Sequence, residues 1–75
     1  MSNNTSYSIE EMSREEISQA FSRCFISREG KIVLSFLRHL TVERSLGPDA
    51  SAEELRHLEG QRCLVRQIEN LCSQK

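Results

Sequence analysis

The segment Ser45-Leu46-Gly47-Pro48-Asp49-Ala50 constrains the fold of this chain more than any other. It separates two long stretches whose apolar residues recur at helical steps. Glycine suits the left-handed residue just past a helix, and proline one step later cannot continue it. The segment therefore predicts the end of one helix and a turn before the next.

The start of the next helix is predicted by Ser51-Ala52-Glu53-Glu54, which has the S-x-x-E form of a capping box. In this motif the serine and the third residue after it satisfy free backbone N–H groups at a helix start. The two glutamates also lie at the positive end of the helix dipole. We expect one helix over about residues 52–73.

Similar signals divide the first half of the chain. Ser13 and Glu16 form another capping box, and Ser27 can cap a second start after a short break. Apolar residues follow each start at three- and four-residue steps, which predicts helices over about 14–26 and 28–44. The stripe of the 28–44 helix is the most apolar, so we expect that helix to be central.

The predicted fold class is all-α: a small three-helix bundle, or a helical hairpin with a third helix across it. Residues 9–75 form a single helical domain, and the polar residues 1–8 are predicted to be a flexible N-terminal arm. A chain near this size buries only about 60% of the surface that its unfolded form exposes, so its core is marginal. A partner can supply the rest.

Composition excludes several classes of function. The 10 Lys+Arg and 11 Asp+Glu nearly balance, so there is no broad cationic field and we do not expect nucleic-acid binding. The sequence has no apolar run near the roughly 20 residues that cross a bilayer, and its N-terminus lacks the features of a signal peptide. We expect a soluble protein with no membrane partner.

The cysteines and histidines give no recognisable site. Cys24, Cys63 and Cys72 are odd in number and widely spaced, which favours reduced thiols over a disulfide framework. His39 and His57 show no short metal-ligand spacing with them and no nucleophile motif. The glutamate pairs at the helix starts fit capping. We therefore expect no metal, no cofactor, no catalytic residue and no enzyme.

One stretch, residues 57–65, breaks the pattern of the last helix. Gly60 lowers helix stability by roughly 1 kcal/mol relative to alanine, and it favours the close approach of another backbone. Arg62 falls on the apolar stripe. Its head can reach water or a carboxylate such as that of Glu59, or it can be held by an acidic group on another helix or subunit. Both alternatives stay open.

The chain resembles a family of small helical structural-protein domains of short-tailed bacteriophages, over about residues 17–72. The residues that carry the resemblance are Phe21 to Phe25, Arg28-Glu29-Gly30-Lys31 with Val33-Leu34, and His57-Leu58-Glu59-Gly60-Gln61-Arg62 with Val65 and Ile68. The resemblance implies a phage particle component or assembly factor, without catalytic residues or cofactor. It marks Glu59, Gly60, Gln61 and Arg62 as the signature positions, with Gly30 as a second point.

These observations lead to one hypothesis about function. We expect a noncatalytic virion structural or assembly protein, found in the virion and in the host cytoplasm during assembly. Its partners are other virion or assembly proteins, with self-association as an option. The expected interface is Glu59, Gly60, Gln61 and Arg62, and the expected close-packing positions are Gly30 and Gly60. The alternatives are a phage regulator that binds a host protein, and a weaker one in which the first two helices bind DNA.

Overall fold

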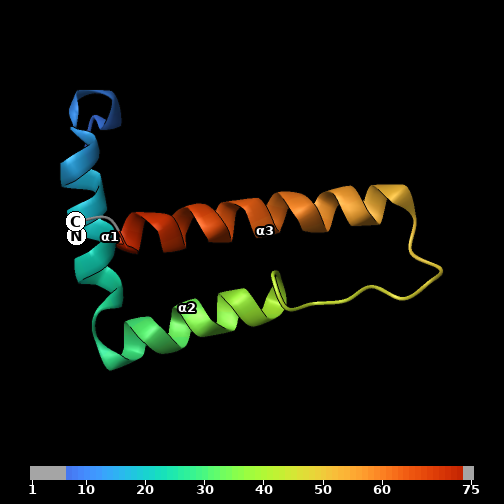
Figure 1. Ribbon diagram of the computed structural model, residues 1–75. Helices are drawn as coiled ribbons and strands as arrows, with labels where there is room; N and C mark the ends of the chain where they lie inside the picture. Colours follow the sequence, from blue (N-terminus) through green and yellow to red (C-terminus); the bar gives the residue numbers. More distant parts are fainter. Residues whose placement is uncertain (1–6, 74–75) are drawn as a thin grey trace, which may run out of the picture.

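The computed structural model of the protein describes residues 7–73 (Figure 1). A 3₁₀ turn, η1 (Ile9–Glu11), precedes three helices: α1 (Arg14–Phe25), α2 (Arg28–Leu40) and α3 (Ala52–Ser73). The described part of the chain contains no strand, so the predicted all-α class is confirmed. Most of the predicted N-terminal arm, residues 1–6, lies outside the described residues.

The three helices form a hairpin with a crossing helix, the second of the two predicted arrangements. Helices α2 and α3 run antiparallel, and α1 lies across the end where α2 begins and α3 finishes (Figure 1). Helix α1 packs against both of the others. The radius of gyration, 15.5 Å, exceeds the about 11 Å of a compact domain of this length, so the fold is open. In the described range, none of the helices has the length and apolar character needed to cross a membrane.

Both capping boxes form as predicted. Ser13 Oγ accepts from the Glu16 N–H at 3.1 Å, while Glu16 Oε1 accepts from the Ser13 N–H at 2.9 Å. At α3 the corresponding distances between Ser51 and Glu54 are 3.0 and 2.8 Å. Donation from the Ser51 backbone and then from its hydroxyl lowers the pKa of Glu54. The predicted bounds of α3 agree with the structure.

The tight turn between α1 and α2 requires glycine at position 30. Ser27 Oγ accepts from the Gly30 N–H at 3.0 Å, which caps α2. A Cβ on Gly30 would lie 2.5 Å from the carbonyl oxygen of Cys24 and 2.6 Å from the Cα of Phe25. The close packing expected at Gly30 is therefore present, and it lets α2 turn directly off the end of α1.

Helix α2 begins at Arg28 as predicted but is shorter than expected. It ends at Leu40 rather than near residue 44, because Thr41 leaves the helical conformation and the chain makes a turn there. The expected left-handed cap at Gly47 is wrong, since no glycine in the described range has a positive φ. Gly47 instead begins a turn, with its carbonyl accepting from the Ala50 N–H at 3.1 Å and Pro48 between them.

The core belongs to α3. In the described range the buried apolar side chains are Leu58, Val65 and Leu71, all on α3. Helix α2 was expected to be central, and this is wrong: its buried residue is Gly30, while Phe36 remains 59% exposed. The periodicity of α2 identified an apolar face correctly, but no other element of the described chain covers most of it.

Replacing Ser51 with alanine tests the cap of α3. Loss of the hydroxyl removes the acceptor for the Glu54 N–H, and we expect Tm to fall by about 4–8 °C. Because the pKa of Glu54 is lowered on folding, its stabilising effect is present above the unfolded pKa of glutamate and is lost as the pH falls through the folded value. Thermal melts between neutral and acidic pH check both effects, with Ser45→Ala, an exposed loop serine, as control. A Ser51→Ala melt identical to that of the control would contradict the capping role.

Gly30 and Gly60 form a matched pair for alanine substitution. A methyl group at Gly30 collides with backbone, so Gly30→Ala should lower Tm although alanine favours a helix. At Gly60 a Cβ meets nothing within 4 Å, so Gly60→Ala should raise the free energy of unfolding by about 0.5–1 kcal/mol. Chemical denaturation of the two variants measures the difference, and a gain in stability at Gly30 would refute the tight turn.

Candidate interaction site

Arg62 on α3 closes the end of α2. Its Nε donates to the carbonyl oxygen of Thr41 at 2.8 Å, and its Nη2 donates to that of Arg44. The last carbonyls of a helix lack partners within the helix and carry partial negative charge. The guanidinium group therefore acts as an external cap, which binds the end of α2 and the following turn to the middle of α3.

Glu59 completes the contact from one turn earlier on the same helix. Its Oε2 lies 2.6 Å from Nη1 of Arg62, and the Arg62 side chain is only 19% exposed. All three nitrogens of the guanidinium group thus have acceptors within the chain. Of the two alternatives for Arg62, the structure favours the intramolecular one, with Glu59 as the expected carboxylate.

The other two signature residues, Gly60 and Gln61, are exposed. Gly60 is exposed and has open space where its Cβ would be, so the close packing expected at Gly60 is not found among the described residues. The side-chain amide nitrogen of Gln61 lies 3.4 Å from Nε2 of His57, one turn away. An interface formed by Glu59, Gly60, Gln61 and Arg62 stays a prediction, in which Arg62 serves by holding its neighbours in place.

Gln61 lines a groove that the sequence did not reveal. The groove lies between the end of α2 and the middle of α3 and has a volume of about 380 Å³. Its lining residues are Leu37, Leu40, Thr41, Arg44, Gln61, Leu64 and Val65. Leu40 and Leu64 remain 44% and 59% exposed, although they line the same hollow. The groove is therefore open and mostly apolar, which suits a protein side chain better than a reacting polar substrate.

A second polar contact sets the spacing of α2 and α3. Nη1 of Arg38 lies 2.8 and 2.9 Å from the two carboxylate oxygens of Glu69, and Nε lies 3.5 Å from Glu43. Thr41, which is buried, donates its hydroxyl to the Leu37 carbonyl at 2.8 Å. Sequence reasoning missed the Arg38–Glu69 pair, because no local spacing connects residues on different helices.

The cysteines and histidines do not converge on a site. Cys24 and Cys63 are exposed and free, and Cys72 is partly buried and free. Burial raises the pKa of the Cys72 thiol, and the nearby Cys24 and Glu69 raise it further, which keeps the thiol protonated and less reactive. Nδ1 of His39 lies 3.8 Å from Glu43 at the surface. In residues 7–73 no three His, Cys, Asp or Glu side chains are grouped as metal ligands.

The fold and the site define a class: a small helical domain in which Arg38 and Arg62 pair with carboxylates of α3 and apolar side chains are exposed. The sequence matches the family of Bbp19-like phage proteins over residues 21–74, which is well over half of the chain. The chain therefore belongs to this phage protein family. Searches of curated proteins and of solved structures found no match.

Replacing Arg62 with alanine tests its role as the cap of α2. Two backbone carbonyls and Glu59 lose their donor, so we expect the free energy of unfolding to fall by about 2–3 kcal/mol. Arg66→Ala, which removes an exposed arginine one turn later on α3, is the control and should change stability little. Urea denaturation of both variants makes the comparison. If they unfold alike, the hydrogen bonds of Arg62 do not hold α2.

Proposed function

We propose that this protein is a noncatalytic structural or assembly component of a phage particle, acting through helical protein–protein contacts. The observation that carries the proposal is the exposure of apolar side chains on α2 beside the groove on α3. Soluble monomers rarely leave a large contiguous apolar patch uncovered, and such a patch usually marks a binding surface. Membership of a phage protein family supports the association with a phage.

The use of the polar side chains also supports a noncatalytic role. Arg38 and Arg62, the two arginines with contacts between helices, are held by Glu69, by Glu59 and by backbone carbonyls. These contacts position α2 against α3 and leave apolar side chains to face a partner. Arg38 lies on α2, one of the two helices that the DNA-binding alternative would use, and its pairing with Glu69 weakens that alternative. Our proposal places the protein in a short-tailed virion, and in the host cytoplasm before assembly.

The second candidate is a small phage regulator that binds a host protein. One observation favours it: the exposed positions Ile32, Phe36 and Leu40 follow at four-residue steps, as in helices that dock into a groove of another protein. Both candidates use the same face. They differ in location, because a structural component stays in the virion and a regulator binds a host protein in the infected cell.

Mass spectrometry of purified virions separates the two candidates. For a structural component we expect several copies per particle, retained after the particles are washed in high salt. A phage with a stop codon early in the gene should give defective or fewer particles. A protein found in infected cells but absent from virions, with normal particles formed without it, would overturn the structural and assembly role and favour the regulator.

A further inference from the structure

Helix α2 exposes a continuous apolar strip. Ile32, Val33, Phe36 and Leu40 recur at three- and four-residue steps, which places them on one side of the helix. They are exposed by 50%, 50%, 59% and 44%. Leu64 of α3 is 59% exposed and lines the same groove as Leu40. We call these five residues the α2–α3 apolar face.

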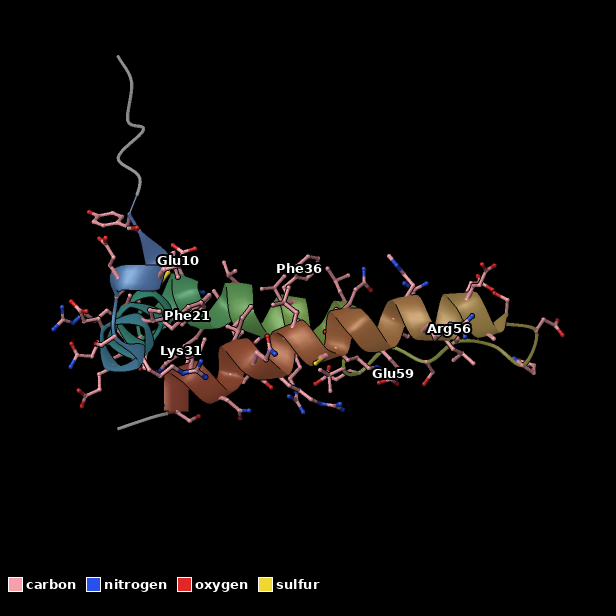
Figure 2. All side chains as sticks on the ribbon, turned by 90° about the horizontal axis from the view of Figure 1, so that it is seen from above. Glu10, Phe21, Lys31, Phe36, Arg56 and Glu59 are labelled. Atoms are coloured by element: carbon pink, nitrogen blue, oxygen red, sulfur yellow. The ribbon has the colours of Figure 1, made fainter. Side chains whose placement is uncertain are left out.

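Two cations of α2 lie away from the middle of this face, whereas Glu29 of α2 and Arg44, which lines the groove with Leu40 and Leu64, border its ends. Figure 2 shows Phe36 on one side of the α2–α3 layer, with Glu59 on the other side. On α2, Lys31 and Arg38 are displaced around the helix from Phe36 by the helical repeat, and Arg38 is turned towards Glu69 of α3. The middle of the face, around Phe36, is therefore best covered by another apolar surface.

The size of the face fits half of a dimer interface. With roughly 200 Å² for a fully exposed large apolar residue, the five side chains expose on the order of 500 Å². A standard interface buries about 800 Å² per partner, of which about 500 Å² is nonpolar. The α2–α3 apolar face therefore supplies the nonpolar area that one side of a standard interface needs.

The arrangement of the face makes it complementary to itself. In a two-fold dimer the same patch meets its own copy, and residues at equal distances on either side of the axis face each other. With the axis at Phe36, Ile32 of one helix α2 lies opposite Leu40 of the other, since both are four residues from Phe36. Both positions are apolar, while Val33 lies opposite the exposed His39 by the same count. The net charge of −1 per chain gives little repulsion between copies.

We propose that two copies of this chain pair through the α2–α3 apolar face, with their α2 helices antiparallel about Phe36. The pairing rests on the proposed function, because it names a second copy as the first partner in assembly. It covers the side of α2 that α1 and α3 leave exposed. It also adds apolar burial to a chain whose own core, in the described range, consists of three α3 side chains.

The first test measures the mass of the full chain by size-exclusion chromatography with light scattering. At roughly 0.1 mM we expect a species of about 17 kDa, twice the 8.6 kDa of one chain. Phe36→Glu and Leu64→Glu place a charge inside the interface and should weaken the dimer about tenfold or more. Leu55→Glu changes an exposed leucine near the start of α3 and should leave the dimer intact.

A second measurement guards against variants that fail to fold. In a mixture of isotope-labelled and unlabelled wild-type chains, isotope-filtered NMR should show contacts between Ile32 of one copy and Leu40 of the other. A wild-type chain that stays monomeric, or a dimer without contacts from α2, would overturn the pairing. A monomer would mean that a different protein covers the face.

The two proposals fail separately. A monomeric chain that is nevertheless present in virions would overturn the pairing and leave the structural function standing. A dimeric chain that is absent from virions, with normal particles formed without it, would overturn the structural function and leave the pairing standing.

Discussion

The position of α2 depends on hydrogen bonds that Arg62 donates to the carbonyls at and beyond its end. Few apolar contacts hold α2 against α3, because most of its large side chains face outwards. A guanidinium group held by two carbonyls and a carboxylate fixes direction as well as distance. The Arg38–Glu69 pair repeats this principle nearer the end of α3. An open fold can therefore keep a defined shape with a small core.

At the other end of the hairpin, a side chain of one helix also donates to a carbonyl near the end of another helix. Ser22 on α1 donates its hydroxyl to the carbonyl oxygen of Cys72 at 2.9 Å, near the end of α3. The Cys72 thiol lies 3.7 Å from the carbonyl oxygen of Phe21 in the same contact. Carbonyls near the ends of α2 and α3 thus receive donors from neighbouring helices. Satisfying these groups joins the helices to each other, in addition to completing each helix.

Local signals predicted much of the fold. The serine caps at Ser13, Ser27 and Ser51 defined the helix starts, because capping depends on residues within one turn. The end of α2 and the exposure of its apolar stripe could not be predicted in this way. A periodic stripe indicates an apolar face, but which element packs on that face depends on the tertiary structure. The sequence marks residues 59–62 as distinctive. The carbonyl partners of Arg62 could not be predicted, because they depend on the position of α2.

Two of the signature residues, Glu59 and Arg62, make polar contacts within the fold, whereas the exposed apolar face does not. Arg62 and Glu59 act on the fold, while Phe36 and Leu64 contribute little to the buried core. Under the proposed function, substitutions on the exposed face would change the choice of partner with little effect on monomer stability. Under that proposal the hairpin is a scaffold whose binding specificity can change independently of the contacts that Arg62 makes.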